Sequence, residues 1–222
     1  MPRRSTIAIA FLLPLLLCAS FASANSVDLL NFNYLKNMQQ VGNFYNGGSG
    51  NPTVPNFGVS FSSNFYGLTS VFQGGSGFFL PDPSQTPVIF ILGPTGTAAT
   101  GTMNVTNGFS SGINFFYTAA FAETMKVWSG ANGTGTVLAT LNLTANDANC
   151  LTVTYCNWTD VGIKFSGTAA SVTFTGPANG LGLADITIGQ ATTAVPEPSS
   201  LYLLSTGLAS LCVKGIRRLM RS

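Results

Sequence analysis

The amino-acid sequence predicts an all-β fold for residues 25–190, an antiparallel β-sandwich that is jelly-roll-like. Apolar and polar residues alternate there with a period of two, as they do in strands that bury one face. Gly, Asn and Pro residues typical of tight turns separate the alternating segments, and almost no helical pattern occurs between residue 40 and the C-terminal tail. With 166 residues the segment has the length of one domain.

The alternation is clearest in the second half of the chain. It predicts strands over residues 137–144, 161–165, 171–175 and 186–188. The residues expected on buried faces are Val137, Ala139, Leu141, Leu143, Val161, Ile163, Phe165, Val172, Phe174, Ile186 and Ile188. The residues expected on the opposite, polar faces are Thr140, Asn142, Thr144, Ser171, Thr173 and Thr175. Turns are predicted at Gly130–Gly135, Gly176–Pro177 and Asn179–Gly180.

Residues 1–24 have the three parts of a secretory signal peptide in the expected order. A basic start, Arg3-Arg4, precedes an apolar stretch over residues 7–18 and a cleavage site of small residues, Ala22-Ser23-Ala24. We therefore expect signal peptidase to cleave this precursor, so that the mature chain begins at Asn25 and is exported. The alternative, a buried N-terminal helix of the fold, does not account for the three features in this order.

The other end of the chain combines a linker, an apolar run and a basic cluster. The linker, residues 191–198, closes with Val195-Pro196-Glu197-Pro198, whose prolines allow a helix to begin only near Ser199. Four basic residues follow the apolar run: Lys214, Arg217, Arg218 and Arg221. The sequence thus predicts one short transmembrane helix with a basic cytoplasmic tail over residues 199–222, which places the sandwich outside the cytoplasm.

This order of parts resembles the PEP-CTERM sorting signal of Gram-negative bacteria, over Val195–Arg221. In that family a membrane protease-transpeptidase, the exosortase, recognises the segment and is thought to cleave near Pro-Glu-Pro. The resemblance implies that Pro196, Glu197 and Pro198 are the recognition element. It also implies an inner-membrane-anchored precursor that is released to the cell surface or an extracellular matrix. An ordinary membrane anchor would not need Pro-Glu-Pro, and a glycolipid-anchor signal would end in its hydrophobic stretch.

The stretch from Gly112 to Gly189 is similar to the β-sandwich ectodomain common among PEP-CTERM proteins. The residues that carry this similarity are Trp158, Val161, Gly162, Phe165, Gly167, the run Ser171-Val172-Thr173-Phe174, and a closing strand around Asp185-Ile186. The similarity implies the fold, since such domains resemble carbohydrate-binding jelly rolls, and it assigns no ligand. Ala184-Asp185 stands where paired acidic residues would favour a calcium site.

The composition excludes several classes of function. Only 7% of the residues are charged, whereas coiled coils, disordered polar tails and basic nucleic-acid binders need many charges. The chain has no histidine, the usual general base and the commonest zinc ligand. The net charge of +2 arises at the two ends, because residues 25–193 hold three Lys against six Asp or Glu, or −3. We expect no nucleic-acid partner, no cofactor and no metal ion.

Three sets of residues are candidates for a chemical role. Cys150 and Cys156 are expected to form a disulfide in an oxidising compartment, and the alternative of a metal site lacks further ligands. Asp147 and Asp160 flank one segment and are the carboxylates considered for glycoside hydrolysis. The aromatic residues considered as platforms for sugar rings are Phe57, Phe61, Phe65, Tyr66, Trp128 and Trp158.

Three functions follow as hypotheses. The first is a non-enzymatic surface or matrix protein that is processed by exosortase. The second is a carbohydrate-binding module for a cell-surface exopolysaccharide, which a cluster of coplanar exposed aromatic rings on one sheet would favour. The third is a glycoside-active enzyme, which two carboxyl groups about 5 to 9 Å apart in a cleft would favour.

Overall fold

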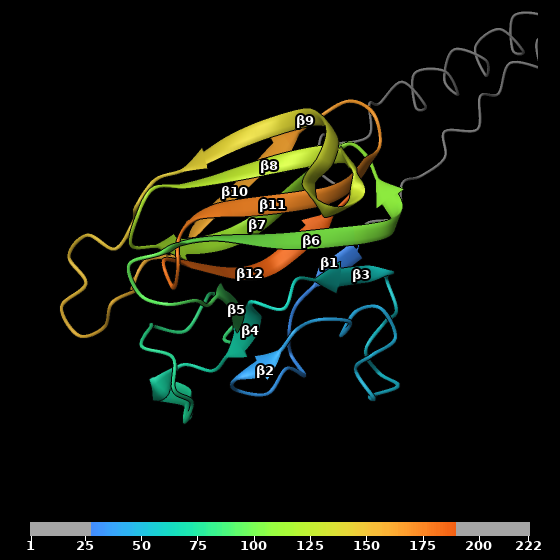
Figure 1. The fold of residues 1–222 in the computed structure, drawn as a ribbon. Helices are drawn as coiled ribbons and strands as arrows, with labels where there is room; N and C mark the ends of the chain where they lie inside the picture. Colours follow the sequence, from blue (N-terminus) through green and yellow to red (C-terminus); the bar gives the residue numbers. More distant parts are fainter. Residues whose placement is uncertain (1–27, 190–222) are drawn as a thin grey trace, which may run out of the picture.

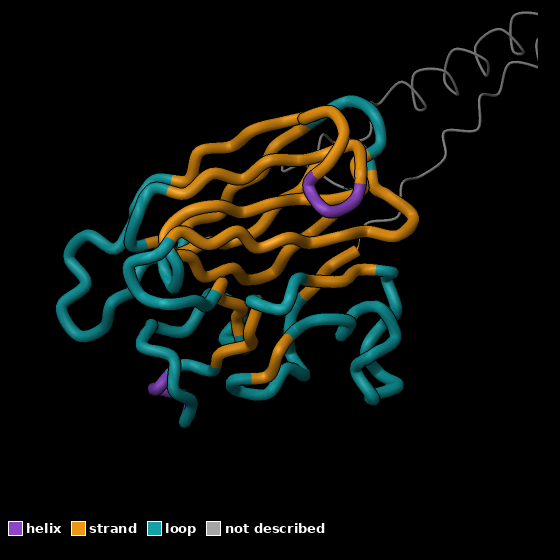
Figure 2. Tube along the Cα trace, in the orientation of Figure 1, coloured by secondary structure: helices purple, strands orange, loops and turns teal. Residues whose placement is uncertain are grey.

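Two antiparallel sheets packed face to face make up residues 28–189, the part of the chain that this computed structural model describes (Figures 1 and 2). The predicted all-β sandwich is confirmed. The predicted signal peptide, the Pro-Glu-Pro linker and the C-terminal helix lie outside the described residues. Within residues 28–189, no helix is long and apolar enough to cross a membrane.

The first sheet has seven strands. Six of them follow the order β10 (Thr159–Lys164), β7 (Gly112–Ala119), β12 (Leu181–Ile188), β5 (Val88–Ile91), β4 (Phe65–Leu68) and β2 (Gln39–Gln40). The seventh, β1 (Asp28–Leu30), pairs with the last three residues of β12. The short strands and long loops of residues 28–92, blue to green in Figure 1, gather along one side of the molecule.

The second sheet has five strands, most of them long. Their order is β3 (Val59–Phe61), β6 (Ala98–Phe109), β11 (Ala169–Pro177), β8 (Glu123–Gly130) and β9 (Thr134–Leu143). Two 3-10 turns complete the described elements, η2 (Val71–Gln73) and η3 (Ala131–Gly133). The turn η3 joins β8 to β9 within the predicted turn region Gly130–Gly135.

The main core lies between the sheets, and Phe174 on β11 is at its centre. Its ring packs edge-to-face against Phe65 on β4 and Phe115 on β7, with ring centroids 6.4 and 5.6 Å apart. All three rings are fully buried. Gly101, which pairs with Phe174 across β6 and β11, leaves the space that Phe65 fills, since a Cβ atom there would clash with its ring.

A second, smaller apolar cluster covers the other face of the seven-stranded sheet. Its buried members are Leu68, Phe79, Val88, Phe90 and Ala184, with Tyr155 and Trp158 packed against them. All four residues of β5 are buried, because Ile89 and Ile91 belong to the main core while Val88 and Phe90 belong to this cluster. A strand buried on both faces has no polar alternation to reveal it.

One predicted strand face is wrong at its first residue. Val127 pairs with Ala139, but the next residue, Trp128, pairs with Val137, so Leu138 is an extra residue in β9. Such a bulge moves the residues beyond it to the opposite face. Val137 therefore lies on the outer face opposite Trp128 and is 40% exposed instead of buried.

The predicted disulfide is confirmed. Cys150 and Cys156 are bonded, with Cα atoms 5.4 Å apart, in the long loop between β9 and β10. Beside it the backbone N–H of Leu80 donates to the carbonyl of Tyr155 at 2.8 Å, and the indole N–H of Trp158 donates to the Leu80 carbonyl at 2.9 Å. These bonds attach the disulfide loop to the loop before β5.

Replacing both cysteines, Cys150→Ser with Cys156→Ser, should lower the free energy of unfolding by about 2 kcal/mol, because the unfolded chain loses a small closed loop. Urea denaturation of the variant and the wild type measures the difference. Leu151→Ser is the matched control, since Leu151 lies inside the loop and is 96% exposed. A double variant as stable as the wild type would show that the bond does not hold this loop in the fold.

Candidate functional site

Three rows of polar side chains cross the outer face of the five-stranded sheet. Directly paired residues of neighbouring antiparallel strands lie on the same face, so the strand register gives the rows. From β6 through β11 to β8 the rows are Thr100, Thr175 and Thr124; Thr102, Thr173 and Lys126; and Asn104, Ser171 and Trp128. The residues between them along each strand, among them Met103, Val172 and Met125, are buried in the core.

Trp128 is held in place by its polar atom. The indole N–H donates to the Thr173 hydroxyl at 2.9 Å, one strand away. The ammonium group of Lys126 lies 5.9 Å from the centroid of the Trp128 ring, which is cation–π distance. Trp128 and Lys126 are both half-buried, so each presents part of its surface to solvent.

The turn after β8 forms one rim of this face. Asn132 and Asn104 exchange two hydrogen bonds: the Asn132 N–H donates at 2.7 Å, and the Asn104 amide donates at 2.9 Å. The N–H of Gly133 donates to the Ser171 hydroxyl at 2.9 Å, which itself donates to the Gly130 carbonyl at 2.6 Å. These bonds fix the turn to the sheet, and Ser171 is fully buried beneath it.

Position 133 requires glycine. Its φ of +68° lies in the left-handed region, and a Cβ atom there would be 2.9 Å from the Thr173 methyl group. The turn therefore approaches β11 closely enough to wall off the end of the sheet beside Trp128.

The rows and the turn enclose a hollow of about 450 Å³, which we call the threonine hollow. Its lining residues are Thr100, Thr102, Thr124, Lys126, Trp128, Asn132, Gly133, Thr173 and Thr175. The lining offers hydroxyls, an amide, one ammonium group and one aromatic ring, and it contains no carboxylate. Its volume lies in the range of small-molecule sites.

Of the six aromatic residues considered from the sequence, only Trp128 lines this hollow. Phe61 and Phe65 are buried in the main core, and Phe57 packs against it. Trp158 packs in the smaller cluster, and Tyr66 lines a shallow hollow on the seven-stranded sheet with Ser63 and Asn64. The six rings therefore do not form one coplanar platform.

The two carboxylates considered for hydrolysis have different surroundings. Asp160 is exposed on the edge strand β10, and the carbonyl of Asp147 accepts the Cys150 N–H of a turn at 3.2 Å. Neither residue lines the threonine hollow.

Another pair of carboxylates, Asp82 and Asp185, interacts electrostatically and has a structural role. Asp82 is 1% exposed and accepts the N–H groups of Ser84 at 3.1 Å and Thr86 at 2.9 Å, while the Ser84 hydroxyl donates to Asp185. Burial raises the pKa of Asp82 to about 6, and the charge of Asp185 adds to the rise. Among residues 28–189, no group of three or more His, Cys, Asp or Glu is placed to hold a metal ion.

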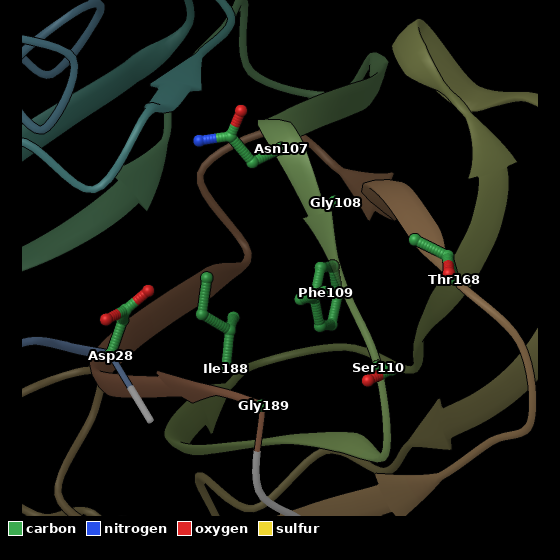
Figure 3. A pocket seen from close by; sticks show the side chains of 8 residues that line it. All are labelled: Asp28, Asn107, Gly108, Phe109, Ser110, Thr168, Ile188 and Gly189. Carbon is green, nitrogen blue, oxygen red and sulfur yellow. The ribbon is translucent and has the colours of Figure 1, made fainter. Parts of the chain in front are cut away.

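A second hollow, of about 240 Å³, lies where β1 and the end of β12 meet the turn between β6 and β7 (Figure 3). Asp28, Asn107, Ser110 and Thr168 supply its polar side chains. Its aromatic residue, Phe109, is 8% exposed and belongs to the core. Because its one aromatic ring is buried in the core, we assign this hollow no ligand.

The fold and the hollow together define a β-sandwich protein that has, on the outer face of one sheet, a polar site with a single aromatic ring. No protein-family model matches the chain, and no curated protein matches it. Among solved structures, the chain is similar to a family 6 carbohydrate-binding module, with 13% identity, a TM-score of 0.38, and coverage of 75% of this chain and 94% of the module.

Two further similarities are of the same order. A family 29 carbohydrate-binding module, solved as a mutant complexed with mannohexaose, has 11% identity and a TM-score of 0.43 over 75% of this chain and 94% of that chain. A family 43 arabinoxylan arabinofuranohydrolase from Bacillus subtilis has 15% identity and a TM-score of 0.38 over 59% of this chain and 26% of that chain. At these values, residue roles rest on the site geometry alone.

Glu123, the first residue of β8, is a buried acid without a hydrogen bond to one of its oxygens. It is 3% exposed, and its Oε1 atom has no partner among the described residues. The carboxyl group fills space left by Gly176 and Gly180, where Cβ atoms would clash with it. Burial raises the pKa of Glu123 from 4.5 to about 7.

This raised pKa predicts a fold that is more stable in mild acid. The folded state holds the Glu123 proton more tightly than the unfolded chain, so the contribution is full below about pH 4.5 and is lost as the pH rises through about 7. We expect the free energy of unfolding to fall by on the order of 2 kcal/mol between about pH 5 and about pH 8. The Asp82 carboxyl group shifts in the same direction and shares in the fall.

Glu123→Gln should reduce this fall, because a neutral amide has no charge to bury. Urea denaturation at the two pH values measures it. Asp160→Asn is the control, because Asp160 is an exposed carboxylate. If the Glu123→Gln and wild-type proteins lost equal stability between the two pH values, Glu123 would not be the group that titrates.

Proposed function

We propose that this chain is an exported, non-enzymatic surface or matrix protein whose sandwich binds a polysaccharide in the threonine hollow. The observation that carries the proposal is the indole of Trp128, which is half-buried, hydrogen-bonded and surrounded by threonine hydroxyl groups. A sugar ring has an apolar C–H face and a rim of hydroxyls, which match an aromatic ring and polar side chains respectively.

The hollow is suited to bind its ligand without large rearrangement. The bond to Thr173 fixes the indole, and the two bonds to Asn104 fix the turn at Asn132. Threonine side chains are restricted at their first torsion, while their hydroxyl groups rotate to donate or accept. Little side-chain freedom is therefore lost on binding, which favours affinity.

The lining supports binding over hydrolysis. Glycoside hydrolysis uses two carboxyl groups that flank the scissile bond, and the threonine hollow is lined by neither Asp nor Glu. This supports a saccharide that is held, not cleaved.

Export and sorting complete the proposal. The signal-peptide features of residues 1–24 and the PEP-CTERM-like order at Val195–Arg221 support an exported precursor that exosortase processes. The Cys150–Cys156 disulfide is of a kind that persists in oxidising compartments outside the cytoplasm. An extracellular polysaccharide is then the ligand class that such a protein meets.

Trp128→Ala should weaken saccharide binding about tenfold or more, because the apolar contact of one aromatic ring is lost. Electrophoresis in gels that contain soluble polysaccharides measures the retardation of each protein. Phe72→Ala is the matched control, since Phe72 is 58% exposed on η2, outside the threonine hollow. Equal retardation of the Trp128→Ala and wild-type proteins would exclude the hollow as the binding site.

Replacing Pro196, Glu197 and Pro198 by alanines should leave the tail attached in a host that contains exosortase, because helix can then extend into the recognition segment. Intact mass of protein from the membrane and the medium measures processing. Alanines at Thr192 and Thr193, in the same linker, are the control. If the triple-alanine protein were shortened and released like the wild type, the segment would be an ordinary anchor.

A further inference from the structure

The five-stranded sheet holds very few charges. Its strands together contain one acidic residue, Glu123, and one basic residue, Lys126. Glu123 is buried toward the interior, whereas Lys126 lines the threonine hollow. The open face of this sheet therefore carries a single, positive charge in a domain whose described residues sum to three Lys against six Asp or Glu.

The neighbours of Lys126 among residues 28–189 leave its charge uncompensated. Its neighbours across the sheet are Thr173 on β11 and Thr140 on β9, and its neighbours along the strand on the same face are Thr124 and Trp128. All four are uncharged. The Trp128 ring attracts the ammonium group but supplies no negative charge.

Lys126 also differs from the other lysines of the described residues. Lys36 and Lys164 are exposed, whereas Lys126 is half-buried in a hollow that is otherwise lined by uncharged side chains. A partly desolvated ammonium group attracts an anion more strongly than one in open water, because the surroundings screen it less. The hollow is thus better suited to an anionic ligand than to a neutral one.

We propose that the threonine hollow selects an acidic saccharide, whose carboxylate or sulfate group pairs with Lys126 while the apolar face of a ring packs against Trp128. This inference rests on the proposed saccharide binding and names its ligand class. The two side chains are two residues apart on one strand, a spacing of about 7 Å, so adjacent parts of one sugar chain reach both. The surrounding threonine hydroxyls donate to the anion or to ring hydroxyls.

The test uses the full-length protein in a neutral detergent and pairs of polymers that differ in charge alone. Polygalacturonate is compared with its fully methyl-esterified form, and dextran sulfate is compared with dextran. We expect the wild type to bind at least one anionic polymer about fivefold or more tighter than its neutral counterpart. The preference should shrink as salt rises from about 0.05 M to about 0.5 M.

Substitutions then locate the charge. Lys126→Gln should abolish the preference, so that the anionic polymer and its neutral counterpart bind this variant equally, and Lys126→Arg should retain it. Lys36→Gln, which removes an exposed lysine elsewhere, is the matched control and should behave as the wild type. Preference for polygalacturonate identifies a uronate ligand, and preference for dextran sulfate alone identifies a sulfated one.

The outcomes separate this inference from the proposed function. If neutral and anionic polymers bind equally and Trp128→Ala weakens both, saccharide binding stands and selection by charge is overturned. A preference that survives Lys126→Gln, or that Lys36→Gln removes equally, also overturns it. If no polymer binds the wild type, the proposed function itself fails.

Discussion

The packing of Phe174 between Phe65 and Phe115 sets the geometry on which the candidate site depends. Phe174 lies on β11, the central strand of the five-stranded sheet, and its ring reaches two strands of the opposite sheet. Because side chains alternate along a strand, burying Phe174 places Thr173 and Thr175 on the outer face. A one-residue slip of β11 would turn these hydroxyls toward the core and the aromatic ring toward the outer face, which the core forbids. The arrangement of the threonine hollow is therefore a consequence of core packing.

Two local departures from regular strand geometry lie beside Trp128. The bulge at Leu138 carries Val137 to the outer face beside Trp128, so the indole has an apolar neighbour on its β9 side. The tight turn at Gly133 closes the end of the sheet and buries Ser171. Regular pairing of β6, β11 and β8 supplies most of the hollow's lining, and the turn at Asn132 and Gly133 supplies the rest.

Much of the fold could be predicted from the sequence, because burial on one face leaves a readable alternation. The alternation at residues 171–175, the turn at Asn179–Gly180 and the disulfide all agree with the structure. The alternation gives the wrong face for Val137, because one extra residue in β9 changes the register there. It does not predict β5, because this strand is buried on both faces and has no polar residues to alternate.

The site was harder to predict than the fold. Trp128 is among the aromatic candidates, but nothing in the sequence distinguishes it from Phe65, which is buried in the main core. Lys126 and the threonines of β6 were not singled out. The alternation Thr100, Thr102, Asn104 in one segment and Thr124, Lys126, Trp128 in another is a usable signal, yet only the pairing of both with β11 brings them together.

The same alternation explains why the charge of Lys126 remains uncompensated within its own sheet. Glu123 and Lys126 lie three residues apart on β8, and an odd separation in a strand places side chains on opposite faces. The acid is turned to the interior, where burial raises its pKa to about 7, and the amine is turned to the hollow. A carboxylate that neutralised Lys126 from this sheet would have to stand at an outward position, and the outward positions beside Lys126 are threonines and Trp128. A negative partner for Lys126 therefore has to come from outside the sheet, as the acidic ligand that we propose would.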